Sequence, residues 1–375
     1  MKGMAQGKER LVVAKVGSST LLKADGSLNK RYMADLCRQI CTLLAEGTQV
    51  VLVSSGAVAA GMERLGLAER PKDVPGLQAC AAAGQAALIE TYAETFQDQG
   101  VTCAQVLLTR EDTARRESYL NARNTFERLL GLGCVPIVNE NDTISVEEFA
   151  FGDNDSLGAI VASLVDASLY VILSDVAGLY TANPQTDPSA TLIPRVTRVD
   201  DEIMRMASGT GSAVGTGGMT TKLRAARAML AAGTQMVVAA GKRTDVLLDV
   251  AHGANVGTRF VPERAASRES ARKLWIGLAG VTRGRLVVDD GAARALVRDG
   301  ASLLPVGVRS VEGSFGEGDI VDVTDEQGRL LGRGAVRYAS EDLDKVRGLK
   351  LEVVERFYPD HAGQAAIHRD DLLVF

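Results

Sequence analysis

Short apolar runs alternate with amphipathic segments over the first 240 residues of the chain. An uninterrupted apolar run is typical of a strand buried on both faces, and apolar residues spaced three or four apart indicate a helix. We expect strands at 11–16, 49–53, 102–108, 134–138, 170–173 and 235–239, and helices at 30–44, 58–65, 77–97, 118–130, 156–164 and 219–232. This alternation predicts an α/β fold whose mostly parallel sheet carries helices on both faces.

The pattern changes after about residue 262. A charged segment rich in small residues is followed by short alternating runs with glycine turns, such as 284–289 and 318–323. Such runs favour a small β-rich domain. We expect a first domain over 1–262, a linker over 263–277, a second domain over 278–357 and a C-terminal tail over 358–375.

Composition excludes several classes of protein. The 42 basic and 47 acidic residues give a net charge of −5 without a basic block, which argues against a general nucleic-acid binder. The five cysteines lack CxxC spacing and there are only three histidines, so neither zinc binding nor a histidine triad is favoured. No apolar run approaches the ~20 residues that a membrane helix needs, and the N-terminus lacks a signal-like apolar core. We expect a cytoplasmic protein without membrane contact.

Polar or glycine-containing groups follow the ends of several expected strands. They lie at 15–18, 54–56, 139–142 and 174–175. Ligands of open α/β sheets bind outside the carboxyl ends of the strands. Each group alone is typical of an ordinary turn, but together they predict one large site at one edge of the sheet.

A glycine-rich segment, Gly215-Thr216-Gly217-Gly218-Met219-Thr220-Thr221-Lys222, opens the expected helix 219–232. Backbone N–H groups at a glycine-rich helix start can hold a phosphate, although such a segment can equally be a surface loop. It matches neither the P-loop, which needs lysine directly after glycine, nor the dinucleotide fingerprint, which needs a further glycine.

Lysines, carboxylates, amides and glycines remain as the chemical groups at this edge, and they suit phosphoryl transfer. That reaction depends on positioning and charge stabilisation, and a carboxylate acceptor needs no general base. Lys15 and Lys222 are the two candidate cations. A lysine that ends a buried strand needs an anionic partner, which can be a ligand or a structural ion pair.

Two polar clusters are candidates for the substrate and one for a nucleotide. Asp153, Asn154 and Asp155 precede a helix, where one of them could act as an N-cap. If the three side chains alternate in direction, Asp153 and Asp155 point one way and Asn154 the other, so one acidic group can orient the lysines while Asn154 meets the substrate. The segment 139–142 is either a turn or a ligand contact, and 174–184 is either a nucleotide contact or a hairpin.

Six segments in register, 15–18, 54–61, 139–142, 152–155, 174–181 and 217–222, together resemble the glutamate 5-kinases of bacteria. That family has an amino-acid kinase domain followed by a PUA domain, and the resemblance covers nearly the whole chain. It implies transfer of the ATP γ-phosphoryl group to the side-chain carboxylate of L-glutamate. This is the first step of proline synthesis, and proline is the expected feedback inhibitor.

The resemblance also implies roles for individual residues. Lys15 and Lys222 would stabilise the transferred phosphoryl group, with Asp155 organising them. The residues that would hold glutamate are Ser55, Asn139, Asp142, Asp153 and Asn154. Those that would hold ATP with its Mg²⁺ are Lys15, Ser174, Asp175, Thr216, Gly217, Gly218, Met219, Thr220, Thr221 and Lys222. No protein ligand to a metal is assigned, and Ser174 replaces an expected threonine while keeping the hydroxyl.

The PUA resemblance suggests RNA binding, since such domains often accompany RNA-modifying enzymes. Residues 281–357 contain 12 basic and 14 acidic residues, a net charge of −2, without a basic stripe. A structural or regulatory role is therefore favoured for this domain. Open alternatives are a sister kinase acting on acetylglutamate, aspartate or uridylate, an RNA-binding protein with a kinase scaffold, and a regulatory proline sensor. A homo-oligomer, dimer or tetramer, is expected.

Overall fold

The structure is a computed structural model that divides into two compact units, Met1–Ala265 and Ala266–Phe375. It describes residues 10–109, 116–144, 154–207, 218–262, 273, 276–277, 282–357, 359 and 363–375. None of the described helices is both long enough and apolar enough to cross a lipid bilayer.

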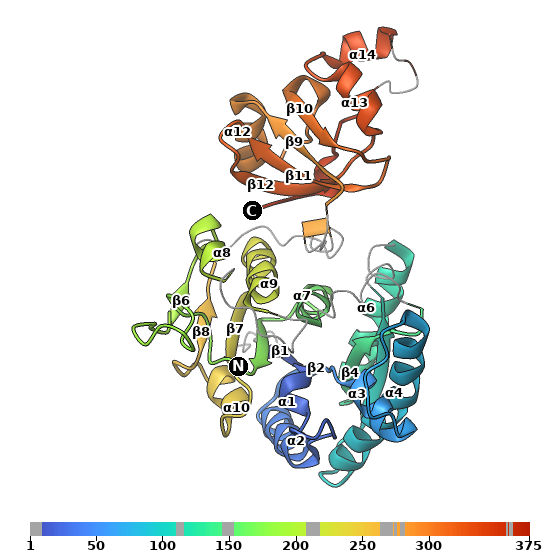
Figure 1. Cartoon of the computed structure of the whole chain (residues 1–375), viewed down its shortest axis with the longest axis vertical. Helices are drawn as coiled ribbons and strands as arrows, with labels where there is room; N and C mark the ends of the chain where they lie inside the picture. Colours follow the sequence, from blue (N-terminus) through green and yellow to red (C-terminus); the bar gives the residue numbers. More distant parts are fainter. Residues whose placement is uncertain are drawn as a thin grey trace, which may run out of the picture. The chain divides into compact units, whose positions relative to one another are not determined.

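The first unit is built on an eight-stranded sheet in the order β3-β4-β2-β1-β5-β7-β8-β6 (Figure 1). Its strands are β1 (Arg10–Val16), β2 (Thr48–Val53), β3 (Cys103–Leu108), β4 (Val135–Glu140), β5 (Leu169–Ser174), β6 (Arg195–Val196), β7 (Gln235–Ala240) and β8 (Thr258–Phe260). The strands from β3 to β7 pair in parallel, and β8 runs antiparallel to β7. The mostly parallel sheet is therefore confirmed.

Helices pack on both faces of this sheet (Figure 1). They are α1 (Ser18–Leu21), α2 (Lys30–Ala45), α3 (Ala57–Leu65), α4 (Val74–Gln97), α6 (Arg116–Gly131), α7 (Asn154–Leu164), α8 (Asp201–Ala207), α9 (Met219–Ala231) and α10 (Val246–Ala251). Apolar side chains of α2, α4 and α10 form one core with alternate residues of the central strands. Helix α7 contacts β1 and β5 and packs against α9.

The strand order changes direction at β1. Strand β2 pairs on one side of β1 and β5 on the other, so Lys15 lies between Val53 and Ile172 at the carboxyl end of the sheet. Helices that leave two such strands in opposite directions open a crevice, and this is where α/β sheets bind ligands. The sheet therefore brings the end of β1 to the position where a ligand is expected.

The second unit has its own sheet and core. Its five strands follow the order β10-β9-β11-β12-β13, with β9 and β11 parallel and the other pairs antiparallel. They are β9 (Gly284–Val288), β10 (Val308–Gly313), β11 (Ile320–Asp325), β12 (Leu330–Ala335) and β13 (Leu372–Val374). Buried Leu286, Val323 and Tyr338 belong to one apolar cluster. The β-rich expectation is confirmed.

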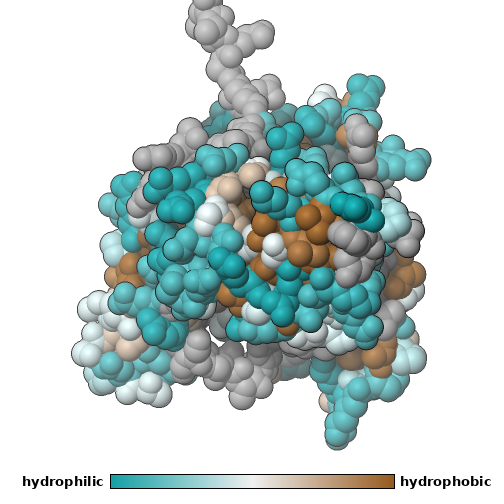
Figure 2. Space-filling model, turned by 90° about the horizontal axis from the view of Figure 1, so that it is seen from above, coloured by the Kyte–Doolittle hydropathy of each residue, from teal (hydrophilic) through white to brown (hydrophobic). Residues whose placement is uncertain are grey.

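Two features of the second unit differ from the sequence-based expectation. Its described part also contains the helices α12 (Asp290–Asp299), α13 (Ser340–Val346) and α14 (Leu351–Phe357). The expected tail over 358–375 includes β13, which pairs with β12 and completes the sheet. Most large apolar side chains of this unit are buried, but Val297 of α12 is 52% exposed. The space-filling view shows a mostly hydrophilic face with an area of apolar residues near its centre and smaller ones towards its edges (Figure 2).

Candidate active site

Two lysines from distant parts of the chain share one buried carboxylate. Lys15 Nζ lies 2.5 Å from Asp155 Oδ1, and Lys222 Nζ lies 3.1 Å from Asp155 Oδ2. The side chains of the two lysines are 8% and 6% exposed, and that of Asp155 is 0% exposed. Each ammonium group has three N–H donors. Lys15 can therefore present a further donor to a ligand while one of its donors binds Asp155.

The local sequence places Asp155 in the first turn of α7. Helix α7 begins at Asn154, and the Tyr170 hydroxyl of β5 donates to the Asp155 carbonyl oxygen over 2.8 Å. Gly158 allows this contact, because a Cβ at that position would lie 2.3 Å from the Tyr170 hydroxyl oxygen. The missing side chain of Gly158 thus lets α7 lie close against the sheet.

The electrostatics of the cluster keep Asp155 ionised. Burial by itself raises the pKa of the Asp155 carboxyl, but the charges and hydrogen bonds of Lys15 and Lys222 outweigh it. The pKa of Asp155 therefore lies below its usual range. An ionised carboxylate holds both ammonium groups at fixed positions, as charge stabilisation in a transition state requires.

The start of α9 forms one side of the site. Gly218 is the N-cap of α9 without a side-chain cap, and Lys222 lies in the first turn of the helix. The Thr221 hydroxyl lies 3.0 Å from Asp155 Oδ2 and 2.8 Å from the Gly218 carbonyl oxygen. Uncapped N–H groups at a helix start are suited to an anion. Thr216 and Gly217 lie outside the described residues, and Met219 and Thr220 are half-buried.

A cluster of amides and hydroxyls lies beside the lysines. The Asn154 side-chain nitrogen lies 2.7 Å from the Ser54 carbonyl oxygen, 3.0 Å from Ser55 Oγ and 3.0 Å from Asn139 Oδ1. The ends of β2 and β4 thus meet the start of α7. Ser55, Asn139 and Asn154, three of the predicted substrate residues, are brought together here.

The expected alternation of side chains over 153–155 is wrong for the part that the structure describes. Asn154 and Asp155 both belong to α7, where successive side chains diverge by about 100° rather than 180°. They still diverge enough for Asp155 to bind the lysines and Asn154 to bind Ser55. Asp153 lies outside the described residues.

Asp142 follows β4 and has a perturbed acidity. Burial raises its pKa to about 6, while the charge of Arg70 opposes part of that rise. A half-buried carboxylate of this kind gains from a cationic ligand, because the ligand offsets the desolvation of the charge.

The residues expected at the nucleotide lie at the carboxyl end of β5. The Ser174 hydroxyl donates to Asp175 Oδ1 over 3.0 Å, and Asp175 is exposed. Tyr180 and Leu192 then form an antiparallel bridge. The hairpin alternative for the segment that begins at 178 therefore describes its backbone, while the nucleotide contact stays a prediction.

Sequence reasoning missed three residues that contact the residues of this site. Gln85 of α4 accepts a hydrogen bond from Asn139 over 2.8 Å, and the Tyr92 hydroxyl lies 3.1 Å from Ser54 Oγ. Tyr170 is the third. The available signal was the position of Gln85 inside the apolar stretch 80–89. Glutamine is mostly exposed in proteins, so a glutamine among residues that are usually buried is informative.

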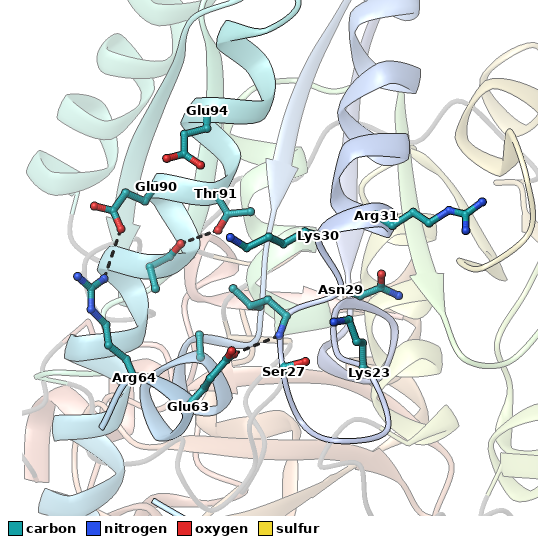
Figure 3. Close-up of a pocket in the computed structure, with 13 residues that line it drawn as sticks. Lys23, Ser27, Asn29, Lys30, Arg31, Glu63, Arg64, Glu90, Thr91 and Glu94 are labelled. Carbon is teal, nitrogen blue, oxygen red and sulfur yellow. Dashed lines mark hydrogen bonds and ion pairs between the residues drawn. The ribbon is translucent and has the colours of Figure 1, made fainter. Parts of the chain in front are cut away.

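A separate pocket of about 630 Å³ lies between the segment 23–31 and helices α3 and α4 (Figure 3). It contains none of the predicted site residues. Its charged side chains are exposed or pair with each other, as Arg64 does with Glu90. Figure 3 shows Lys30 and Arg31 on one side and Glu90 and Glu94 on the other. This is the character of a solvated surface hollow rather than of a phosphoryl-transfer site.

Comparison with known proteins agrees with the geometry. Residues 10–240 match the amino acid kinase family, and residues 284–358 match the PUA domain. The glutamate 5-kinase of Myxococcus xanthus (strain DK1622) is 47% identical over 365 residues, covering 97% of this chain and 96% of that protein. The glutamate 5-kinase of Dehalococcoides mccartyi (strain CBDB1) is 45% identical, with 97% and 98% covered. The chain belongs to the glutamate 5-kinase family.

Membership of the glutamate 5-kinase family extends over both compact units. A third relative, the glutamate 5-kinase of Caldanaerobacter subterraneus subsp. tengcongensis, is 46% identical over 363 residues and is covered to 97% in each chain. The amino acid kinase match includes Lys15, Asp155 and Lys222. The shared carboxylate thus lies in the kinase part of this family member.

Proposed function

We propose that the protein transfers the γ-phosphoryl group of ATP to the side-chain carboxylate of L-glutamate, giving L-glutamyl 5-phosphate and ADP. This is the first step of proline biosynthesis. One observation supports the proposal most: Lys15 and Lys222 share the buried Asp155 in a chain that is 44–47% identical to proteins named glutamate 5-kinase.

In this reaction a carboxylate oxygen of glutamate attacks the γ-phosphorus, and the bond from that phosphorus to the β,γ-bridging oxygen breaks. ADP leaves with the electron pair. The acceptor is already ionised at neutral pH, so no general base is needed. Lys15 and Lys222 donate to the oxygens of the moving phosphoryl group, while Asp155 fixes their positions.

Glutamate is held by Ser55, Asn139, Asp142, Asp153 and Asn154 in this proposal. The ionised Asp142 attracts the α-ammonium group, and the hydroxyl and amide groups of Ser55 and Asn154 supply hydrogen bonds. Ser55 follows β2, and Asn139 and Asp142 lie at the end of β4 or just after it; both strands are on the opposite side of β1 from β5 and β7. Glutamate and ATP therefore approach the end of β1 from opposite sides.

ATP is held by Lys15, Ser174, Asp175 and the segment from Thr216 to Lys222, with Mg²⁺ bound to its phosphates. Among the described residues, no group of three or more His, Cys, Asp or Glu side chains is placed to hold a metal ion. Mg²⁺ does not need such a group, because it usually keeps several waters and binds through substrate phosphates rather than through a protein cage. When bound, the ion neutralises phosphate charge.

Residues 1–262 form the catalytic domain in this proposal, and residues 278–357 form a PUA domain with a structural or regulatory role. We further propose a cytoplasmic homo-oligomer that is inhibited by proline. Strand β3 lies at the edge of the sheet with Leu107 of β3 37% exposed, and such an edge favours association with another chain.

The test is an ADP-release assay with glutamate, acetylglutamate, aspartate and uridylate as acceptors, with and without proline. Turnover with glutamate that proline suppresses supports the proposal. Turnover with another acceptor alone would assign the chain to a sister kinase. RNA affinity that falls with salt, without ATP turnover, would favour the RNA-binding alternative.

A further inference from the structure

The side-chain amides of Gln85, Asn139 and Asn154 form a hydrogen-bonded chain with a fixed direction. The Glu140 backbone N–H lies 2.9 Å from Asn139 Oδ1, and a backbone N–H can only donate. The Ser54 carbonyl oxygen can only accept, so the Asn154 atom 2.7 Å away is the amide nitrogen. These two backbone groups determine the orientation of the Asn139 and Asn154 amides, because an amide oxygen only accepts and an amide nitrogen only donates.

The fixed direction of these hydrogen bonds determines which amide atoms donate and which accept. Asn139 must present its nitrogen to Gln85, and it donates to Gln85 Oε1 over 2.8 Å. The two hydrogens of Asn154 Nδ2 are shared among three acceptors, which lie on Ser54, Ser55 and Asn139. Within the described part of the chain, Asn154 Oδ1 receives no hydrogen bond. Asn154 therefore offers an acceptor to a ligand.

We propose that Gln85 is a positioning residue for recognition of the substrate's α-ammonium group, acting through Asn139 and Asn154. The inference rests on the proposed function, because its ligand is L-glutamate at that site. An ammonium group is a pure donor and matches the acceptor on Asn154. The Asp142 carboxylate supplies the opposite charge.

The role of Gln85 follows from the burial of Asn139, which is 2% exposed. A buried amide nitrogen without an acceptor is unfavourable. Without Oε1 of Gln85, the Asn139 side chain must turn towards another acceptor, and its own Oδ1 then leaves Asn154. Asn154 loses one of the contacts that fix its amide plane. Gln85 thereby fixes the orientation of Asn154, which contacts the substrate, although Gln85 itself does not.

Comparing glutamate with glutarate tests the inference. Glutarate has the same two carboxylates but lacks the amino group. The kcat/KM for glutamate divided by that for glutarate therefore reports recognition of the ammonium group. The variants are Gln85→Met, which removes the acceptor, and Gln85→Glu, which keeps an acceptor facing Asn139. The control is Glu94→Met, a similar change at an exposed position of the same helix.

Gln85→Met is expected to lower the ratio about tenfold, mainly by raising the glutamate KM, while the KM for ATP stays within about twofold. Gln85→Glu and Glu94→Met are expected to keep the ratio of the unmodified protein. An equal loss for both acceptors in Gln85→Met would show a merely structural role and overturn the inference, as would an unchanged ratio.

If Gln85→Met does not fold, Gln85→Glu decides alone: a retained ratio supports the inference and a tenfold lower one overturns it. Absence of glutamate turnover by the unmodified protein is a different result. It would overturn the proposed function before any variant is compared. The failure of the two proposals is therefore distinguishable.

Discussion

Lys15 and Lys222 bind the two oxygens of the same carboxylate, one from the end of the central strand β1 and the other from the first turn of α9. Their ammonium groups are thereby held apart on opposite oxygens of Asp155. A phosphoryl group that passes between a nucleotide and an acceptor spreads negative charge over its oxygens. Two cations fixed in advance stabilise that charge without reorganising during the reaction.

Replacing the lysine of α9 tests its part in the reaction. We expect Lys222→Ala to lower kcat about 100- to 1,000-fold, since it removes one preorganised donor from the transition state. The KM for glutamate should change little, because Lys222 belongs to the proposed nucleotide site. Steady-state kinetics of Lys222→Ala, with Lys242→Ala as an exposed-lysine control, measures this. A near-normal kcat would remove Lys222 from the mechanism.

Neutralising the shared carboxylate should affect both stability and activity. Asp155→Asn leaves two buried ammonium groups without their anion, and breaking a buried ion pair in this way destabilises by about 3–5 kcal/mol. We expect a lower Tm that ATP partly restores, because phosphates replace the missing negative charge. Thermal unfolding with and without ATP provides the measurement. An unchanged Tm would mean that the lysines do not depend on Asp155.

Glutamate binding should weaken below pH 6. The pKa of Asp142 is raised to about 6 by burial, so this carboxyl becomes neutral as the pH falls through that value. A bound ammonium group favours the charged form, and binding is therefore linked to loss of this proton. The KM for glutamate measured from pH 5 to pH 8 should rise towards low pH. In Asp142→Asn it should be higher throughout and lose that dependence.

The raised pKa of Asp142 also makes the stability of the folded protein depend on pH. Asp142 binds its proton more tightly in the folded than in the unfolded chain, so it favours folding at low pH. That contribution is lost as the pH rises from about 4 through about 6. Unfolding without substrate should show that the Asp142→Asn variant gains stability relative to the unmodified protein above pH 6. Equal stability of the two at every pH would contradict the shifted acidity.

The second unit should show little affinity for RNA. Several arginines in the described part of this unit form ion pairs with carboxylates: Arg285, Arg309, Arg329, Arg333, Arg337 and Arg347 each lie within 4.0 Å of an Asp or Glu oxygen. Paired cations release few counterions when a phosphate backbone approaches. Filter binding of a double-stranded RNA at 50 mM and 200 mM salt should detect no tight, salt-dependent complex. Tight binding would assign an RNA-directed role to this unit.

The main sheet could be predicted because its strands are continuous apolar runs. Strands β6 and β8 were missed, since they are two and three residues long and exist only through their pairing. Helix α12 was also missed, although Asp289 caps its start and Gly300 its end. Those two capping signals are local and readable, but the surrounding alternation favoured strands.

Some residues of the site could likewise be predicted from local sequence, whereas others depend on tertiary packing. Lys15, Asp155 and Lys222 stand next to recognisable strand or helix ends, so the sequence indicates them. Gln85 lies in the middle of a helix, and only the tertiary packing of α4 brings it to Asn139. No spacing in the sequence reveals that contact.

The most direct test of the central proposal is to follow the γ-phosphoryl group itself. The protein is incubated with Mg-ATP and L-glutamate in the presence of hydroxylamine, which traps an acyl phosphate as a hydroxamate. We expect one glutamyl hydroxamate for each ADP formed, and at least a hundredfold less from Lys222→Ala. ADP formation without hydroxamate, or equal yields from the two proteins, would contradict the account.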